Sequence, residues 1–359
     1  MLPTTPPRQQ LIRADSEQDA VLGWLAEFSN RPATLRSYRK EAERFMLWLA
    51  SRDQQLGNVK RQDVLDYERF LAHPHPAEQW IGPAVGRKHP AWKPFSGPLS
   101  ASSIRHAMTV LGSLFSYLNH AGVLTGNPFR LLRKPAASQQ LALERFFDQD
   151  CWRLIVQAVH ALPAGSAREI AQRERALWVI SLLYYSGARR GEAAAAVMGD
   201  FFQLRQRWWW RVNGKTGVAD IPVNDALLAA LQRYRRQLGL APLPVHQEQT
   251  PLICAMSKAG EVPRPLGDKA LYLITREIFQ RAATLAEDAA SRDKLTRAST
   301  HWLRHTSASH QLQAGIDLLL VSQNLRHRSI QTTRRYLHSE LDQRHDALQK
   351  LNGLGEPEN

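Results

Sequence analysis

Apolar residues recur at helical spacing along most of this 359-residue chain, and this periodicity constrains the fold more than any other feature. Residues 19–28 are a clear example, because their apolar side chains share one helical face: Ala20, Val21, Trp24, Leu25 and Phe28. The same reasoning predicts further helices at residues 33–51, 61–72, 100–121, 148–162, 167–186, 225–238, 269–289, 300–314, 317–325 and 331–354.

One stretch departs from helical spacing and predicts a β-hairpin. Residues 208–212 are aromatic and β-branched, residues 213–217 read Asn-Gly-Lys-Thr-Gly and form a turn, and residues 218–223 return as a second strand. The fold is therefore predicted to be mainly α with a small antiparallel β-sheet.

Changes in composition divide the chain into domains. Residues 1–16 form a polar tail, and a linker at 136–145 separates a helical domain at 17–135 from a second domain at 146–359, which ends in a helix. The first domain contains an insertion at 73–99 with six prolines and a string of basic and aromatic residues. A loop of this length in a compact domain is usually functional or mobile.

The net charge points to a polyanionic partner. The chain has 47 Lys and Arg against 33 Asp and Glu, a formal charge of +14. A folded protein this basic usually binds nucleic acid, although a basic protein without such a partner is the alternative. The helix at 33–51 is expected to carry Arg44 on its polar face. The candidate DNA-binding residues lie on that helix and in the insertion: Arg36, Arg39, Lys40, Arg87, Lys88 and Lys93.

Several classes of protein are excluded by what the sequence lacks. Cys151 and Cys254 are the only cysteines, so there is neither a disulfide framework nor a cysteine-based zinc site. No Walker A loop or dinucleotide-binding glycine motif is present. No apolar run is long enough to span a bilayer, and the N-terminal stretch lacks the apolar segment of a signal peptide. We expect a cytoplasmic protein without membrane association.

Four separated segments carry residues suited to phosphate chemistry. They are the run from Gly187 to Glu192 with Arg189 inside it, Lys215 at the hairpin tip, the run His301-Trp302-Leu303-Arg304-His305, and His327 with Tyr336 nine residues later and Thr332-Thr333 between them. Each segment alone has an ordinary structural explanation, such as a helix-end charge, a solvated lysine, an ion pair or a packed tyrosine.

Together, in order and spacing, these segments resemble the tyrosine recombinases, also called the phage integrase family. The resemblance covers residues 141–354 and extends more loosely to Thr34, Tyr38, Phe45 and Trp48 in the helical domain. It implies a SAM-like core-binding domain that contacts DNA and an integrase-type α+β catalytic domain, which together form a C-shaped clamp.

The resemblance also implies the catalytic residues: Arg189, Lys215, His301, Arg304, His327 and Tyr336. Tyr336 would attack the scissile phosphate, leaving a 3′-phosphotyrosyl link and a free 5′-hydroxyl, so rejoining needs no ATP. Arg189 and Arg304 would bind the non-bridging oxygens. Lys215 would protonate the leaving oxygen. No metal or other cofactor is expected.

Two histidines complete the implied site. His301 would act as an acid, base or hydrogen-bond partner near the tyrosine, and His327 would help to hold the phosphate. Glu192 is expected to orient a helix or a positive group, while Tyr184 and Tyr185 are expected to pack.

The function implied is site-specific DNA recombination, with strand exchange between two sites through a Holliday junction. The expected assembly is a homotetramer on two double-stranded DNA sites, with a partner recombinase or accessory protein as a further possibility. The expected setting is the nucleoid of a bacterium or phage system, for integration, excision or resolution of a mobile element. Two alternatives stay open: a non-catalytic DNA-binding regulator and a type IB topoisomerase. A covalent DNA adduct excludes the regulator, and exchange between two sites excludes the topoisomerase.

Two positions depart from the family pattern. Arg326 stands where the family commonly has glycine before the histidine, and a positive φ angle there costs a non-glycine residue about 1 kcal/mol. We therefore expect the turn before His327 to differ. The strand that follows Lys215 is also less basic than is usual in the family.

Overall fold

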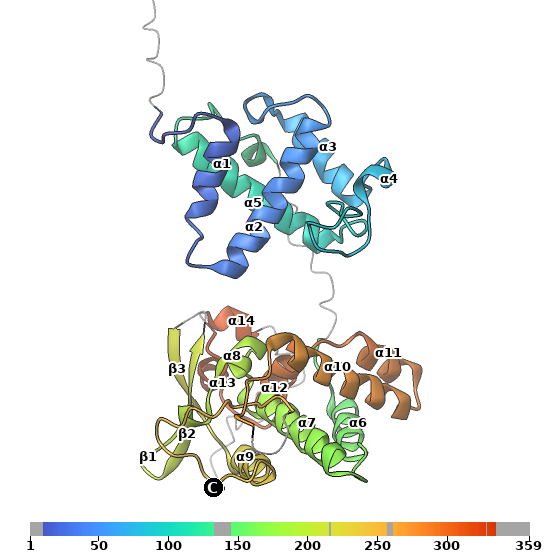
Figure 1. Cartoon of the computed structure of the whole chain (residues 1–359), viewed down its shortest axis with the longest axis vertical. Helices are drawn as coiled ribbons and strands as arrows, with labels where there is room; N and C mark the ends of the chain where they lie inside the picture. Colours follow the sequence, from blue (N-terminus) through green and yellow to red (C-terminus); the bar gives the residue numbers. More distant parts are fainter. Residues whose placement is uncertain (1–9, 133–144, 215–216, 257–260, 328, 335–359) are drawn as a thin grey trace, which may run out of the picture. The chain divides into compact units, whose positions relative to one another are not determined.

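The computed structural model describes residues 10–132, 145–214, 217–256, 261–327 and 329–334. These residues are mostly helical with one three-stranded antiparallel sheet, which confirms the predicted fold class. The chain separates into two compact units, Met1–Ser138 and Gln139–Asn359, and each is described by itself (Figure 1). The predicted C-shaped clamp and the finer domain boundaries stay predictions.

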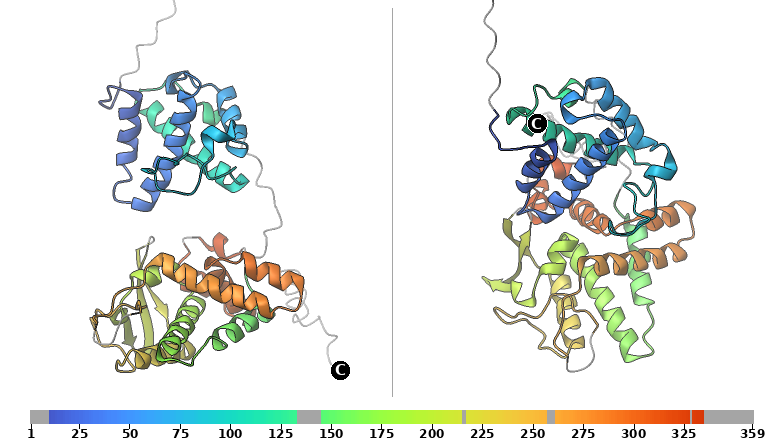
Figure 2. Two further views of the ribbon diagram at one scale, coloured as in Figure 1. Left: turned by 45° about the vertical axis from the view of Figure 1, so that its right-hand side comes forward. Right: turned by 45° about the horizontal axis from the view of Figure 1, so that its top comes forward.

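Helices are the main secondary structure in the described residues of the first unit. Its α-helices are α1 (Glu17–Ala26), α2 (Pro32–Ala50), α3 (Arg61–Ala72), α4 (Ala77–Trp80) and α5 (Ala101–His120). The long helix α5 contacts α1, α2 and α3 (Figure 2). Phe45 on α2 is fully buried, and its ring lies 4.8 Å from that of Tyr67 and 5.9 Å from that of Phe115. These aromatic contacts hold the three longest helices around one core.

The insertion at 73–99 is anchored to this core rather than loose. Trp80 and Phe95 are buried, and an isolated parallel bridge pairs Ile81 with Phe95. Arg44 donates from Nε to the Pro94 carbonyl at 3.0 Å, and its guanidinium lies 4.4 Å from the centre of the Phe95 ring. Arg44 is therefore buried against the insertion, and the expectation that it belongs to an exposed polar face is wrong.

The second unit is built around helix α7, whose second half is mostly buried. Its α-helices are α6 (Gln149–His160), α7 (Ala167–Ser186), α8 (Arg190–Ala195), α9 (Asp225–Gln237), α10 (Asp268–Leu285), α11 (Ala289–Arg297), α12 (His301–Gln313), α13 (Leu318–Asn324) and α14 (Ile330–Arg334). Helix α7 contacts α6, α9, α10 and α12, and Trp178 on it donates from its indole to the Leu252 carbonyl at 2.9 Å. The sheet lies at one side of this unit, and α10 and α11 lie at the other (Figure 1).

The sheet has one strand more than the predicted hairpin. Strands β1 (Phe201–Leu204), β2 (Arg207–Gly214) and β3 (Gly217–Pro222) pair in that order. The turn between β1 and β2 places Arg205 and Gln206 at φ angles of 50° and 62°. Hairpin turns with two positive φ angles usually carry Asn or Gly, so this Arg-Gln turn gives no sequence signal.

The helices also differ in detail from the prediction. The helix predicted at 269–289 ends at Leu285 as α10, and α11 at Ala289–Arg297 is a further helix that the sequence did not predict. The Asp288 side chain accepts from the Ser291 N–H at 2.7 Å and so caps the new helix. The predicted helix at 331–354 is represented by α14, and its remainder lies outside the described residues.

Candidate active site

Gly187 forms the tight turn that leads from α7 to Arg189. It follows the last residue of α7 and has a φ angle of +56°, the left-handed conformation in which glycine carries no steric penalty. A Cβ atom at this position would also collide with the Leu325 side chain. Both the conformation and the close approach therefore require glycine, and the turn directs Arg189 to the start of α8.

Arg304 ties this turn to a second one. It lies on α12, is 3% exposed, and donates from Nη1 to the Gly187 carbonyl at 2.5 Å and from Nη2 to the Leu325 carbonyl. Leu325 directly follows α13 and precedes Arg326 and His327. One buried guanidinium thus brings together three segments that are far apart in sequence, each with a predicted site residue: Arg189, Arg304 itself and His327.

A buried carboxylate orients Arg189. Glu192 accepts from the Arg189 backbone N–H at 2.7 Å and from Arg189 Nη1 at 2.8 Å, and its side chain is 6% exposed. It therefore caps α8 and fixes a guanidinium at the same time, as expected. A Cβ atom on Gly214 would collide with the Glu192 carboxylate, so the end of β2 lies directly against it.

A second arginine binds the same carboxylate. Arg326 donates from Nη2 to Glu192 Oε2 at 2.5 Å, and the Arg326 side chain is 6% exposed. Its φ angle is +53°, so it adopts the left-handed conformation at a strain of about 1–2 kcal/mol. Burial lowers the pKa of Arg326, and Glu192 opposes that shift. The sequence pointed to this position only as an arginine at a family glycine; its contact with Glu192 was missed.

His327 is held by the next helix along the chain. Its Nδ1 lies 2.8 Å from the hydroxyl oxygen of Thr333, which is fully buried on α14. This contact links the turn after α13 to the helix that leads toward Tyr336. Tyr336 itself and Lys215 lie outside the described residues.

His301 and His305 lie with Arg304 on one helix, as the spacing predicted. His301 is the first residue of α12 and is exposed, and its ring lies 4.4 Å from the ring of His305 in an edge-to-face arrangement. A position at the solvent end of the helix that carries Arg304 is compatible with a role in proton transfer.

Arg190 belongs to a different interaction. It forms a two-point ion pair with Asp268 on α10, at 2.6 and 2.7 Å, and its guanidinium lies 5.3 Å from the centre of the Tyr272 ring. Arg190 therefore connects α8 to α10, while its neighbour Arg189 turns to Glu192. This contrast supports the choice of Arg189 as the site arginine.

Tyr184, near the site arginine, is packed and weakly acidic. Its ring stacks on Trp152 at 3.8 Å, and its hydroxyl lies 2.9 Å from Nδ1 of His310. Burial raises the pKa of Tyr184 to about 12, which favours the protonated phenol. These contacts make Tyr184 a poor nucleophile.

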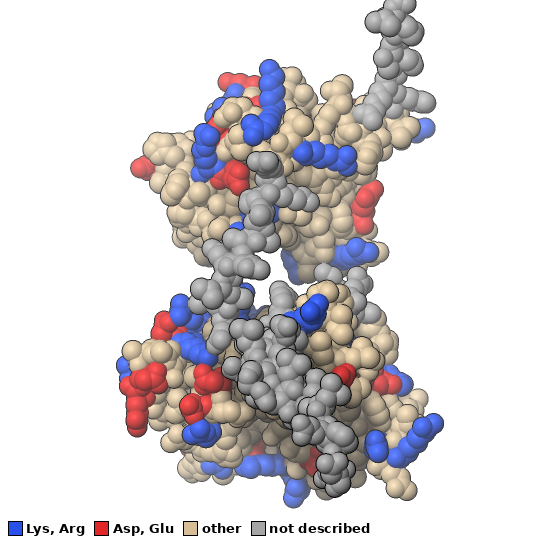
Figure 3. Space-filling view, turned by 180° about the vertical axis from the view of Figure 1, so that it is seen from behind, with Lys and Arg blue, Asp and Glu red and all other residues tan. Residues whose placement is uncertain are grey.

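The predicted DNA-binding residues differ in how they are engaged. Arg36, Arg39 and Lys88 are exposed. The remaining three make contacts within the unit: Lys40 with Glu41 at 3.3 Å, Arg87 with Glu43 and the face of Trp92, and Lys93 with the Glu78 carbonyl. On the face drawn in Figure 3, basic side chains lie on both units with acidic ones among them.

Neither a metal centre nor a membrane span is found in the part of the chain that the structure describes. Within it, no three His, Cys, Asp or Glu side chains are grouped as metal ligands. None of the described helices combines the length and the apolar character that a bilayer crossing needs.

Comparison with known proteins places these features in a family. The model of the phage integrase family matches residues 145–343. Tyrosine recombinase XerC 2 of Ralstonia nicotianae is 27% identical over 92% of this chain and 82% of that protein. Tyrosine recombinase XerD of Rhizobium meliloti is 26% identical over 89% of each.

Solved structures share the fold. A post-cleavage complex of XerH site-specific recombinase with palindromic difH substrate has a TM-score of 0.63 at 18% identity, covering 94% of this chain and 85% of that one. The Tn1549 transposon integrase with circular intermediate DNA has a TM-score of 0.62 at 14% identity, covering 93% and 98%.

Proposed function

Since the chain belongs to the phage integrase family, we propose that it recombines DNA at specific sites, with Tyr336 as the nucleophile. The observation that carries this proposal is the pair of hydrogen bonds from Arg304 to the Gly187 and Leu325 carbonyls. These bonds hold Arg304 against the turn that leads to Arg189, so the two arginines expected to bind the phosphate belong to one site. The regulator and topoisomerase alternatives are not favoured, since the relatives are named as recombinases.

In the proposed reaction, the Tyr336 hydroxyl attacks the scissile phosphorus and the bond to the 5′-oxygen breaks. The phosphate then links tyrosine to the 3′ end of one fragment of the cleaved strand, and the other fragment of that strand ends in a 5′-hydroxyl. Arg189 and Arg304 stabilise the charge that builds on the non-bridging oxygens. Attack by a 5′-hydroxyl from another duplex reverses the chemistry and joins the strands without ATP.

The proton transfers are assigned to three residues. Lys215 gives a proton to the leaving 5′-oxygen, and its neighbour Gly214 lies against Glu192, which is the carboxylate that binds Arg189. His301, exposed at the start of α12, takes part in proton transfer at the tyrosine. His327 donates to the phosphate, oriented by Thr333.

The proposed assembly is a homotetramer on two double-stranded DNA sites in the cytoplasm, acting alone or with a partner recombinase or accessory protein. The exposed basic residues of the first unit, with Arg36, Arg39 and Lys88 foremost, contact the DNA backbone. The biological task is integration, excision or resolution of a mobile element.

Exchange between two duplexes tests this function. A binding sequence is first selected from a random DNA pool, and two duplexes of different length that carry it are mixed with the protein. Products of recombinant length are expected. Cleavage and relaxation without recombinant products would instead indicate a topoisomerase, and binding without cleavage would indicate a regulator.

DNA binding is expected to depend steeply on salt. If each protomer contacts 6–10 phosphates, the affinity falls by about 10³–10⁵ between 50 and 200 mM salt, because bound cations are released from the DNA. Fluorescence anisotropy at a series of salt concentrations measures this slope. A flat dependence would show that the +14 charge does not act on a nucleic-acid backbone.

Lys215→Ala is expected to be slow on ordinary DNA and largely restored on a 5′-bridging phosphorothiolate. An alkoxide is a poor leaving group unless it receives a proton. A thiol is far more acidic, with a pKa of about 8.5 for cysteine, so the thiolate leaves without receiving a proton. Cleavage rates on the two substrates measure the rescue. Arg304→Ala is the control, because sulfur in the bridging position does not replace an interaction with non-bridging oxygens. Equal defects of Lys215→Ala on both substrates would assign the acid to another residue, with His301 the first candidate.

A further inference from the structure

The arginine pair around Glu192 changes the charge of the proposed phosphate site. Glu192 is buried and bonded to Arg189 at 2.8 Å, so on its own it would cancel the charge of that arginine. Arg326 binds the other carboxylate oxygen at 2.5 Å. With two arginines and one glutamate, the cluster keeps a net charge of +1 next to the turn that carries His327.

Arg326 is held in this place against its backbone preference. Its φ angle of +53° is one that glycine adopts freely and arginine does not. Strained residues of this kind persist where the surroundings fix them, and they concentrate at functional sites. Here the fixing contact is the buried ion pair with Glu192.

Arg326 also has hydrogen-bonding capacity that the protein does not use. Its Nη1 is shielded from solvent and has no hydrogen-bond partner among the described residues. Only one of its two terminal amino groups therefore binds a carboxylate. The guanidinium remains charged even when buried. Because no acceptor among the described residues binds Nη1, its positive charge is offset there only by Glu192.

We propose that Arg326 is a positioning residue for DNA cleavage, which keeps Glu192 from neutralising Arg189 at the scissile phosphate. Glu192 holds Arg189 in place, and Arg326 balances the negative charge that this support introduces. The proposal rests on the proposed function, since it assumes that Arg189 binds the phosphate. Arg326 acts through Glu192 and need not touch the DNA.

A double-mutant cycle tests the proposal through the rate of covalent complex formation on a nicked DNA site. Arg326→Met removes the charge but keeps much of the side-chain volume, and it is expected to slow cleavage by about 10-fold or more. Glu192→Gln removes the negative charge but keeps an acceptor for Arg189. In that background, Arg326→Met is expected to change the rate by less than about threefold, because no charge is left to balance. Arg326→Lys, which keeps the charge, should recover most of the rate.

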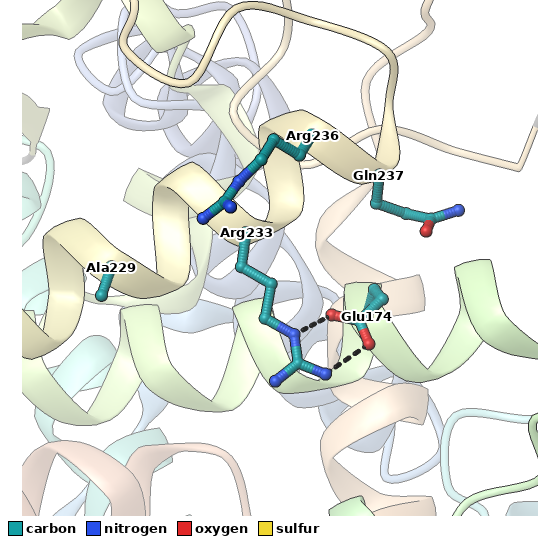
Figure 4. Close-up of a pocket in the computed structure, with 5 residues that line it drawn as sticks. All are labelled: Glu174, Ala229, Arg233, Arg236 and Gln237. Carbon is teal, nitrogen blue, oxygen red and sulfur yellow. Dashed lines mark hydrogen bonds and ion pairs between the residues drawn. The ribbon is translucent and has the colours of Figure 1, made fainter.

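Arg233→Met supplies a matched control. Glu174 on α7 is also 6% exposed and lies between two arginines, with Arg173 at 3.8 Å and a two-point pair to Arg233 on α9 (Figure 4). Glu174 is 13 residues before Gly187, which places it about 20 Å away along a helix axis. Arg233→Met removes a half-exposed arginine from an equally buried carboxylate and should lower the melting temperature while leaving the cleavage rate unchanged.

The outcomes separate this proposal from the proposed function. If the wild-type protein forms no covalent complex, the function fails and not the role of Arg326 alone. If the wild type cleaves and Arg326→Met is equally slow with Glu192 or Gln at position 192, Arg326 is structural and the proposal is overturned. An inactive Glu192→Gln variant would overturn the proposal as well, because cleavage would then require the negative charge of Glu192. DNA affinity should stay constant throughout, since Arg326 is buried.

Discussion

Tyr336→Phe is expected to abolish covalent attachment to DNA completely while leaving DNA binding intact. The substitution removes only the phenolic oxygen, the proposed nucleophile, so the ester to this residue cannot form. A nicked site in which the short strand diffuses away after cleavage traps the wild-type adduct, and a denaturing gel measures it.

The control for this variant is binding, measured by gel shift on the same DNA. Tyr184 is not expected to substitute for Tyr336, because it is stacked on Trp152 and burial raises its pKa to about 12. A protein–DNA adduct formed by Tyr336→Phe would overturn the assignment of the nucleophile.

Arg189→Ala and Arg304→Ala are each expected to slow cleavage by about 100-fold or more. A well-placed donor to a developing oxyanion contributes about 3 kcal/mol to the transition state, and either variant removes one. Single-turnover cleavage measures the effect, with DNA affinity expected to change much less.

The two variants should differ in stability. Arg304 is buried and donates to the Gly187 and Leu325 carbonyls, so its removal leaves two buried acceptors without partners and lowers the melting temperature. Arg189 is about one-third exposed, so its removal should affect stability less. Arg190→Ala, which removes the pair with Asp268 and the contact with the Tyr272 ring, is the rate control. A larger defect for Arg190→Ala than for Arg189→Ala would mean that the catalytic register at residues 187–192 is wrong.

Most helices of this chain were predictable because their apolar spacing is regular. The structure departs from the prediction where a turn or a helix cap determines the local conformation. The strand β1 escaped detection because Arg205 and Gln206 occupy positive φ angles that residues of their type rarely adopt. Helix α11 escaped prediction because residues 289–297 are mostly polar, and its start depends on a cap from Asp288. In both cases a few side chains decide the local structure, and the apolar spacing gives no sign of it.

Only those parts of the site were predictable whose residues lie close together in the sequence. His301 and Arg304 lie on one helix as their spacing requires, and Gly187 forms the turn before Arg189. The ion pair between Glu192 and Arg326 joins residues 134 positions apart, so no local pattern reports it. The roles of Lys215 and Tyr336 come from the family resemblance and remain predictions, since both residues lie outside the described segments.

Mass spectrometry of the trapped complex tests the central claim most directly. After nuclease and trypsin digestion, the account predicts a nucleotide 3′-phosphate attached to the peptide of residues 336–344, in which Tyr336 is the only tyrosine. Fragmentation should place the added mass on that residue. A nucleotide found on any other side chain, or a wild-type protein that cleaves DNA without any attached nucleotide, would contradict the account.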